Sequence, residues 1–369
     1  MSKARYIMIG GFLGAGKTTS VVALAQHLSD AGQTVGLITN DQGRKLVDTA
    51  MLRSKGFATE EIPGGCFCCR FNSLVDAAGK LTESMRPDVF IAEPVGSCTD
   101  LVATVTYPLR RIYGDDFRIA PLSVLVDSVR ASRIFGLAKG GQFSEKVIYI
   151  YRKQLEEADL IVINKTDLLE PDALAALSAN LAEEFPNADV LQVSARTDEG
   201  MDNWFAKITD AEQIARNVME VDYETYAEGE ALLGWLNATV QLHGTDGFEA
   251  KPLLQQLAGD IQNQLNEQST EIAHLKMTLS PDSGLGGDVA IINLVRNDLV
   301  PELSSDLDEP IRSGQLIINL RAEGDPDALR AAVETAIANA PAGLTATLDH
   351  LEHFRPGKPE PTHRVTDLV

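Results

Sequence analysis

The sequence predicts an α/β fold, with a mainly parallel sheet flanked by helices and a small α+β domain after it. Over the first 200 residues, short runs of Val, Ile and Leu alternate with Ala- and Leu-rich segments of helical length. This alternation is typical of a parallel sheet that is buried on both faces. Near residue 212 the alternation ends, and the segments that follow predict a second domain.

The first domain is expected over residues 1–212. Its strands are expected over residues 5–10, 34–40, 89–93, 121–127, 158–164 and 190–194. Its helices are expected over residues 18–30, 73–84 and 172–184. Because the carboxyl ends of parallel strands meet at one edge of a sheet, functional residues should gather at that edge.

An acidic connector, residues 213–230, precedes the second domain, which is expected over residues 231–354. Asp325 should cap a helix that has Pro326 at its first position. The other expected elements are a helix over residues 250–268 and strands over residues 231–242, 271–280, 288–295, 315–322 and 344–353. This order resembles a βαββαβ sandwich with an extra strand. Residues 355–369 contain three prolines and are expected to form an extended tail.

The chain is strongly acidic. Its 369 residues carry a formal net charge of −21, and the sequence pI is about 4.7. Such a charge repels nucleic acid and anionic membranes, so neither is expected as a partner. An acidic surface that only keeps the protein soluble is the simpler explanation, and a specific basic client is the alternative.

Cysteine usage favours a reducing, cytoplasmic location. Three of the four cysteines lie within four positions, which does not suit a disulfide framework. The N-terminal apolar run, residues 6–9, continues directly into a glycine-rich loop instead of a cleavage site. No run reaches the roughly 18 apolar residues of a membrane span.

The glycine-rich loop extends from Gly11 to Thr18 and matches the phosphate-binding pattern G-x4-G-K-[ST]. It follows an expected strand and precedes an expected helix, which is the context that the pattern requires. Glycines allow backbone N–H groups to approach phosphates, and the helix N-terminus adds partial positive charge. We expect Lys17 to contact the β and γ phosphates and Thr18 to bind Mg²⁺, as in a P-loop NTPase.

A second segment, Asn164-Lys165-Thr166-Asp167, ends an apolar strand downstream of this loop. The Asp167 carboxylate is expected to accept hydrogen bonds from the ring N–H and the exocyclic amine of guanine. Adenine lacks this pair of donors and would leave the carboxylate without partners, which is costly. After the next strand, a backbone N–H at Ser194-Ala195 is expected to meet the guanine carbonyl.

Carboxylates follow two further strands. Glu93 precedes Pro94-Val95-Gly96, and it is a candidate to hold Mg²⁺ through water or to orient the attacking water. The N–H of Gly96 is a candidate γ-phosphate sensor. Asp41 and Asp48 are candidates for Mg²⁺, for positioning water or for a second metal. A strand-end carboxylate without a role is the alternative in each case.

The most distinctive segment is the cysteine loop, Gly64-Gly65-Cys66-Phe67-Cys68-Cys69. Thiolates are soft ligands that suit zinc, and cobalt, nickel and iron remain open. The glycines predict a tight exposed loop that supplies two or three ligands, so Cys98, Asp41, Asp48 or a partner's side chain must complete the site. Buried packing or redox chemistry of the thiols is the alternative.

Together, GFLGAGKTT, NDQG, GGCFCC, EPVG and NKTD occur in the order seen in the CobW/HypB/UreG family of SIMIBI-class GTPases. The resemblance is strong over residues 1–200 and is nearest to the CobW-like branch, whose second domain is also small and α+β. It implies GTP, Mg²⁺ and a transition metal as cofactors. The nucleotide-binding residues that it implies are Gly11, Gly14, Ala15, Gly16, Lys17, Thr18, Thr19, Gly96, Asn164, Lys165, Asp167, Ser194 and Ala195.

The chain also departs from the CobW-like pattern. It has Asp41 and Gln42 where Glu-Phe is usual, and Pro94 where Thr or Ser is usual. Its six histidines are scattered, so a large zinc-buffering role is not expected. Cys98 is outside the usual pattern and becomes a fourth thiol ligand if it lies near the cysteine loop.

The resemblance implies a GTPase that couples its nucleotide state to metal delivery, with a client metalloprotein or cobalamin-related enzyme as partner. Lys17 would stabilise the transferring phosphoryl group, and Glu93 or Asp41 would position water. No arginine finger is evident, so slow turnover that a partner or a homodimer stimulates is expected. The alternatives are a metal-responsive GTP switch without delivery and a small-molecule phosphotransferase.

Overall fold

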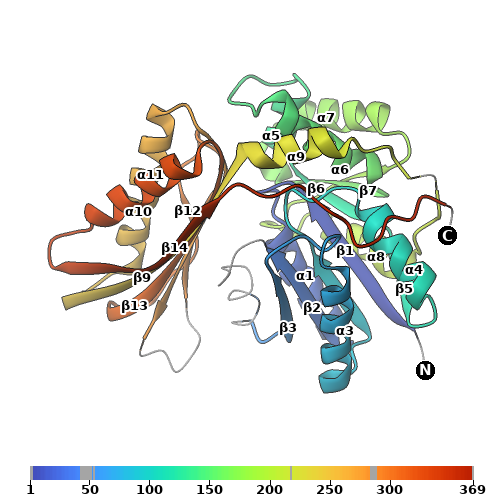
Figure 1. Cartoon of the computed structure of the whole chain (residues 1–369), viewed down its shortest axis with the longest axis horizontal. Coiled ribbons are helices and arrows are strands. Elements are labelled where there is room, and N and C mark those ends of the chain that lie inside the picture. The colour runs from blue at the N-terminus through green and yellow to red at the C-terminus, as the bar shows by residue number, and fades with distance from the viewer. Residues whose placement is uncertain (1–2, 42–51, 53–54, 217, 283–288, 368–369) are drawn as a thin grey trace. The chain divides into compact units, whose positions relative to one another are not determined.

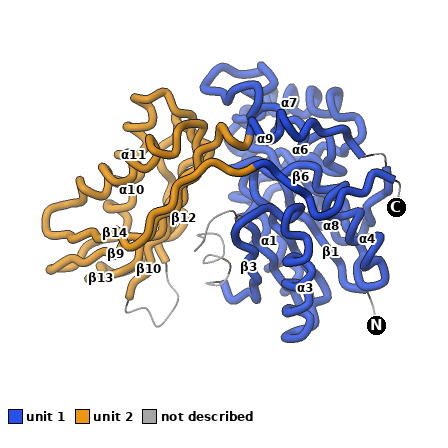
Figure 2. The backbone as a smooth tube through the Cα atoms, in the orientation of Figure 1, with its two compact units in different colours: residues 1–42, 55–229, 358–369 blue, residues 43–54, 230–357 orange. Residues whose placement is uncertain are grey.

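The computed structural model describes residues 3–41, 52, 55–216, 218–282 and 289–367. The chain divides into two compact units, coloured separately in Figure 2. Unit 1 comprises residues 1–42, 55–229 and 358–369, and unit 2 comprises residues 43–54 and 230–357. The end of the chain therefore belongs to the unit in which the chain begins.

Unit 1 is built on a parallel sheet with helices packed around it (Figure 1), which confirms the predicted fold class. The strand order is β3-β2-β4-β1-β6-β7-β8, and β5 also pairs with β1. The strands are β1 (Ala4–Gly11), β2 (Val35–Asp41), β3 (Thr59–Pro63), β4 (Val89–Glu93), β5 (Phe117–Ile119), β6 (Ser123–Asp127), β7 (Leu160–Asn164) and β8 (Asp189–Gln192). Every residue of β4, β6 and β7 is buried, as expected for strands that helices cover on both sides.

The helices of unit 1 include all three that the sequence predicted. They are α1 (Lys17–Asp30), α3 (Phe71–Met85), α4 (Tyr107–Tyr113), α5 (Ser128–Ile134), α6 (Glu145–Glu157), α7 (Pro171–Glu184), α8 (Met201–Asp210) and most of α9 (Tyr223–Leu232), whose last three residues belong to unit 2. A π-helix (Val102–Thr106) precedes α4, and a single 3-10 turn (Thr166–Leu168) follows β7. The segment expected as an acidic connector, residues 213–230, contains most of α9.

Unit 2 is a small α+β unit, as predicted. Its six-stranded antiparallel sheet has the order β12-β11-β10-β13-β9-β14. The elements are β9 (Leu233–Phe248), α10 (Ala250–Glu267), β10 (Glu271–Pro281), β11 (Ala290–Leu294), β12 (Glu302–Ser305), β13 (Ile311–Glu323), α11 (Pro326–Ala338) and β14 (Leu344–Phe354). Asp325 caps α11 as expected, because its side chain accepts the N–H of Asp327 at 2.8 Å.

One face of this second sheet forms a continuous apolar core with α10 and α11. Alternate residues of β9 and β13, such as Leu236, Val240, Leu316 and Leu320, are fully buried in this core. The period of two follows from strand geometry, in which successive side chains point to opposite faces. The core therefore explains why this segment forms a unit of its own.

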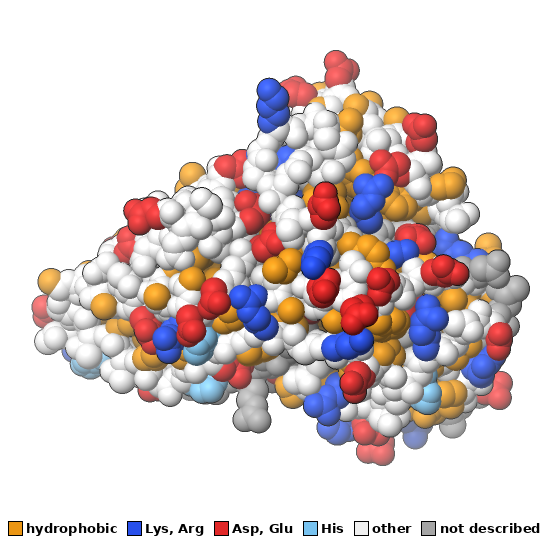
Figure 3. Space-filling model, turned by 45° about the horizontal axis from the view of Figure 1, so that its top comes forward, with side chains coloured by type: hydrophobic (Ala, Val, Ile, Leu, Met, Phe, Trp, Pro, Cys, Tyr) orange, Lys and Arg blue, Asp and Glu red, His pale blue; other side chains and the backbone are white. Residues whose placement is uncertain are grey.

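The surface is charged and mixed. On the face shown in Figure 3, Asp and Glu side chains are interspersed with Lys and Arg side chains. None of the described helices is both long and apolar enough to cross a lipid bilayer.

The sheet of unit 1 brings the predicted motifs to one edge. Strands β1 and β4 are parallel neighbours, and β4 also pairs with β2. Strand β1 leads into the phosphate loop, β4 ends at Glu93 and β2 ends at Asp41. On the other side of β1, β6 pairs with β7, which ends at Asn164.

Candidate functional site

The loop between β1 and α1 depends on glycine at two positions. Gly11 and Gly16 have φ angles of +127° and +94°, which side chains other than glycine rarely adopt. A Cβ atom on Gly16 would lie 2.3 Å from Nδ2 of Asn164, and one on Gly11 would lie 2.3 Å from the carbonyl oxygen of Leu125. The loop can therefore be closely enclosed only because these positions lack side chains.

The loop closes on the ammonium group of Lys17. This residue begins α1 and is buried, and its Nζ atom donates to the carbonyl oxygen of Phe12 at 3.3 Å. The ammonium thus lies at the helix N-terminus, where anions bind favourably. Thr19, another predicted binding residue, is exposed in the first turn of α1.

The structure brings Thr18 and Glu93 together, as the Mg²⁺ prediction requires. Thr18 Oγ1 donates to Glu93 Oε1 at 3.0 Å, and both side chains are buried. A hydroxyl beside a carboxylate is an oxygen donor set that suits Mg²⁺. Gly96 also lies against the loop, since a Cβ atom there would be 3.0 Å from the backbone nitrogen of Leu13.

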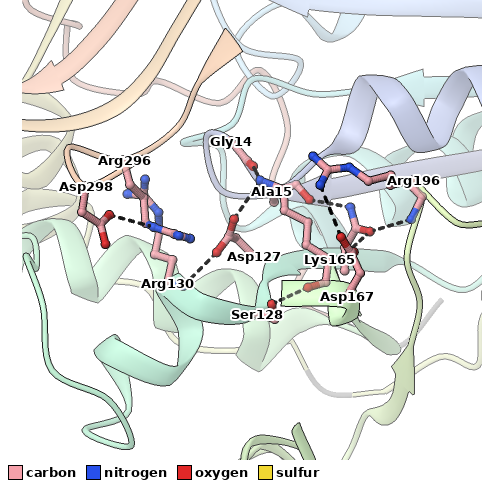
Figure 4. Close-up of polar contacts among 12 residues, drawn as sticks. Gly14, Ala15, Asp127, Ser128, Arg130, Lys165, Asp167, Arg196, Arg296 and Asp298 are labelled. Atoms are coloured by element: carbon pink, nitrogen blue, oxygen red, sulfur yellow. Dashed lines mark hydrogen bonds and ion pairs between the residues drawn. The ribbon is translucent and has the colours of Figure 1, made fainter. Parts of the chain in front are cut away.

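Asn164 and Lys165 support the phosphate loop from β7, as Figure 4 shows for Lys165. Asn164 Nδ2 donates to the carbonyl oxygen of Ala15 at 2.9 Å, and Lys165 Nζ donates to that of Gly14 at 2.8 Å. Lys165 also forms an ion pair of 2.7 Å with Asp127, whose side chain is 2% exposed. These contacts connect the segment Asn164-Lys165-Thr166-Asp167 to the phosphate loop.

The Asp167 carboxylate is oriented by two neighbours. Its Oδ1 accepts from Ser194 Oγ at 2.7 Å, and its Oδ2 lies 3.5 Å from Nη1 of Arg196 (Figure 4). A backbone N–H at Ser194-Ala195 was expected to meet the guanine carbonyl, and that of Ala195 donates here to Asn164 Oδ1 at 3.1 Å. Arg196 was not among the predicted site residues, although it directly follows Ser194-Ala195.

The cysteine loop lies between β3 and α3, and its three thiols converge. Cys66 Sγ lies 2.7 Å from that of Cys68 and 3.1 Å from that of Cys69, and the other pair is 3.6 Å apart. All four cysteines of the chain are free thiols. The expectation of an exposed loop was wrong for Cys66 and Cys68, which are buried, while Cys69 is half-buried. The φ angles of +74° at Gly64 and +145° at Gly65 make the turn that folds the thiols inward.

The thiols perturb one another strongly. Hydrogen bonds from Cys68, Cys69 and Cys98 lower the pKa of the Cys66 thiol. The bond to Cys66 raises the pKa of Cys69 to about 11, and the same interaction together with burial raises the pKa of Cys68. The arrangement thus favours the thiolate form of Cys66 over those of Cys68 and Cys69. Cys98 is buried and interacts with Cys66, but it lies outside the group formed by Cys66, Cys68 and Cys69, whose ligand atoms are all within 4.8 Å of one another.

The end of β2 also contacts the cysteine loop. Asn40 Nδ2 donates to the carbonyl oxygen of Gly65 at 2.6 Å, and Asp41 pairs with Pro63 in the sheet. The side chain of Asp41 and the whole of Asp48 lie outside the part of the chain that the structure describes. Their predicted roles therefore stay predictions.

Two residues of α6 hold the segment after Glu93, and no motif in the sequence indicated either of them. Gln154 Nε2 donates to the carbonyl oxygens of Gly96 at 3.0 Å and Cys98 at 2.8 Å. Glu157 accepts the N–H of Val102 at 3.0 Å, and its burial raises its pKa to about 8. The candidate γ-phosphate sensor is therefore anchored from a helix some sixty residues away in sequence.

Known proteins are similar in sequence to about half of this chain. A zinc chaperone from Escherichia coli K12, YeiR, is 33% identical over 177 residues, which cover 46% of this chain and 49% of YeiR. The zinc chaperone CobW of a Sinorhizobium species is 31% identical over 199 residues, covering 46% of this chain and 53% of CobW. The matched part thus spans about half the length of these relatives. Zn(II)-bound YjiA GTPase from E. coli is a solved structure with 17% identity and a TM-score of 0.40, with 91% of this chain and 99% of YjiA covered.

A family model shows to which protein family the chain belongs. The model for the nucleotide-binding domain of CobW/HypB/UreG matches residues 5–192, which are about half of the chain and include the phosphate loop, the cysteine loop and Asp167. Glu93 and Asn164, which end β4 and β7, also lie within the matched residues. The chain therefore belongs to the CobW/HypB/UreG family of P-loop GTPases.

Proposed function

We propose that this protein is a GTP-hydrolysing metallochaperone that couples its nucleotide state to the binding and delivery of a transition metal. The observation that carries this proposal is the convergence of the Cys66, Cys68 and Cys69 thiols within 4.8 Å of one another. This cluster lies in the same unit as the phosphate loop and is bonded to the end of β2, a strand of the same sheet. Relatives named zinc chaperones support zinc as the metal, and Co²⁺, Ni²⁺ and Fe²⁺ are the alternatives.

The nucleotide half of the proposal assigns a role to each motif. Asp167 selects guanine, and Lys17 with the loop N–H groups stabilises charge on the transferring phosphoryl group. Thr18 and Glu93 hold Mg²⁺, which neutralises phosphate charge. Glu93 or Asp41 positions the attacking water.

The metal half of the proposal uses Cys98 as the link between the two sites. Cys98 lies two residues after Gly96, the candidate γ-phosphate sensor, and its thiol interacts with Cys66. A movement of Gly96 on loss of the γ-phosphate would therefore withdraw one of four thiol ligands. A four-thiolate site retains metal and a three-thiolate site is open, so GTP hydrolysis would favour release to a client metalloprotein.

The guanine assignment is tested with Asp167→Asn. In the variant, no carboxylate accepts hydrogen bonds from the ring N–H and the amine of guanine, so GTP affinity should fall by about 100-fold or more. Xanthosine triphosphate carries a carbonyl in place of the amine, and it should bind the variant better than GTP does. Calorimetry with ATP, GTP and xanthosine triphosphate checks both results. Equal binding of ATP and GTP by the wild-type protein would instead favour a phosphotransferase.

The metal assignment is tested by replacing Cys66, Cys68 and Cys69 with Ser and, separately, by Cys98→Ser. The triple variant should lose stoichiometric Zn²⁺ in elemental analysis, whereas Cys98→Ser should retain it with lower affinity. Co²⁺ absorption should show a change of coordination in the single variant. Retention of metal by the triple variant would place the site elsewhere. Failure of GTP hydrolysis to transfer metal to any apo-client would support the alternative of a metal-responsive switch.

A further inference from the structure

The segment of residues 358–367, here called the C-terminal strap, lies on the cysteine loop. Thr362 N donates to the carbonyl oxygen of Cys68 at 2.8 Å, and Thr362 Oγ1 donates to that of Cys69 at 3.1 Å. Glu360 N lies 3.3 Å from Sγ of Cys69 and donates to it. The carbonyl groups of Cys68 and Cys69 flank the backbone dihedral angles of Cys69. Because Thr362 binds both carbonyls, it restrains these angles and so orients the Cys69 side chain.

The sequence of the strap prepares it for these contacts. Pro359 and Pro361 fix their own φ angles and have no N–H group, so Glu360 and Thr362 are the donors available at this point. Proline also reduces the conformational freedom that the strap loses when it is ordered. His363 packs edge-on against Phe71, the first residue of α3, with ring centroids 5.0 Å apart.

Farther along, the strap contacts the segment that follows Gly96. Arg364 Nε donates to Asp100 Oδ2 at 2.7 Å, and Val365 N donates to the carbonyl oxygen of Ala103 at 2.8 Å. Asp100 is buried, and its φ angle of +65° is uncommon for a residue other than glycine. Tyr223 from α9 donates to the same carboxylate oxygen at 2.6 Å. One strap thus contacts both the thiols and the segment that carries Cys98.

We propose that the C-terminal strap is a positioning element of the metal site. It orients Cys69 through Thr362 and Glu360, and it keeps the cysteine loop in register with the segment after Gly96. Groups that hydrogen-bond to metal ligands without touching the metal typically change metal affinity by about 10- to 100-fold when they are lost. This inference rests on the proposed function in one respect, which is that the thiols bind a metal.

The test uses the full chain with Thr362→Pro, which removes both hydrogen bonds of Thr362, and Thr362→Ser, which retains both. Asp367→Ala is the matched control, because Asp367 lies on the same strap and its side chain forms an exposed ion pair of 3.7 Å with Arg111 of α4. Three quantities are measured: the alkylation rate of Cys69 in the metal-free protein by mass spectrometry, Zn²⁺ affinity by chelator competition, and GTP affinity. The Co²⁺ spectrum then reports coordination geometry, which a purely structural role of the strap would leave unchanged.

We expect Thr362→Pro to raise the alkylation rate and to weaken Zn²⁺ binding by about 10-fold or more, with an altered Co²⁺ spectrum and unchanged GTP affinity. Thr362→Ser and Asp367→Ala should match the wild-type protein in every measurement. Unchanged alkylation and Zn²⁺ affinity in Thr362→Pro would overturn the inference. If wild-type protein binds no Zn²⁺, the proposed function fails, whereas the alkylation rates still show whether the strap positions Cys69.

Discussion

Glu157 provides a sharp test of how the segment after Gly96 is anchored. Its carboxyl group is buried at the end of α6, where it accepts the N–H of Val102 at 3.0 Å and the hydroxyl of Thr99 at 3.3 Å. Burial is the main cause that raises its pKa from 4.5 to about 8. Replacing it with Gln retains the shape and one acceptor oxygen but removes the ionisable group.

The sign of the effect follows from the two pKa values. Between pH 4.5 and about 8, Glu157 ionises in the unfolded chain while it stays protonated in the folded protein, so stability falls as the pH rises. At about 1.36 kcal/mol per pKa unit, the loss totals about 4 to 5 kcal/mol above pH 8. Because the hydrogen bonds of an amide differ from those of an acid, we expect Glu157→Gln to stabilise unit 1 by about 2 to 4 kcal/mol at pH 8. The gain at pH 5 should be below about 1 kcal/mol.

The assay is urea unfolding at pH 5, 6.5 and 8 in a Trp235→Phe background. The fluorescence then comes from Trp204 of unit 1, which is fully buried and donates to Ser123 Oγ at 2.9 Å. Glu156→Gln is the control, because its side chain is 45% exposed and forms an ion pair of 2.7 Å with the nearby Lys153. This control should change stability by less than about 1 kcal/mol. A Glu157→Gln effect that is independent of pH would refute the reasoning.

Three other outcomes are expected. Lys165→Met deprives the buried Asp127 of its ammonium partner, so unfolding should become easier by about 3 kcal/mol, whereas the exposed Lys207→Met should cost less than about 1 kcal/mol in the same urea assay. Equal losses of stability in these two variants would contradict the burial assigned to Asp127. Gly96→Ala places a Cβ atom 2.8 Å from Cδ2 of Leu13, and phosphate-release kinetics should show GTP turnover reduced by about 10-fold with GDP affinity little changed. Zn²⁺ loading should slow alkylation of the cysteine loop and a strong chelator should restore it; equal rates would argue against metal binding by these thiols.

The strands that the sequence predicted best are those that a continuous run of apolar residues marks. Strands β4, β6 and β7 are continuous apolar runs, and each is buried along its whole length. The edge strand β3 has the sequence TEEIP, and β5 has only three residues, so neither carries such a run. Helix α9 was missed for a related reason: it lies in an acidic segment, although Tyr226 within it is 1% exposed.

The candidate site was predictable where one motif supplies all the partners. The phosphate loop and the cysteine loop are each one continuous segment of the sequence. The spacing within each segment was therefore enough to predict that its residues act together. The contacts of Cys98, Gln154 and Glu157 join segments separated by tens of residues, and no pattern in the sequence reports such pairings. Arg196 differs because it follows Ser194-Ala195, and only the direction of its side chain was unknown.

The return of the C-terminal strap to unit 1 also has a consequence for biosynthesis. Cys69 leaves the ribosome 291 residues before Glu360, and residues 230–357 of unit 2 are synthesised in between. The thiols of the nascent chain therefore remain uncovered on one side while the rest of the protein is made. Closing so long a loop is slow compared with local folding, because chain entropy is lost before the contacts form. A metal that binds as proposed would therefore encounter an open site during translation. After synthesis is complete, it would encounter a site that the strap restrains.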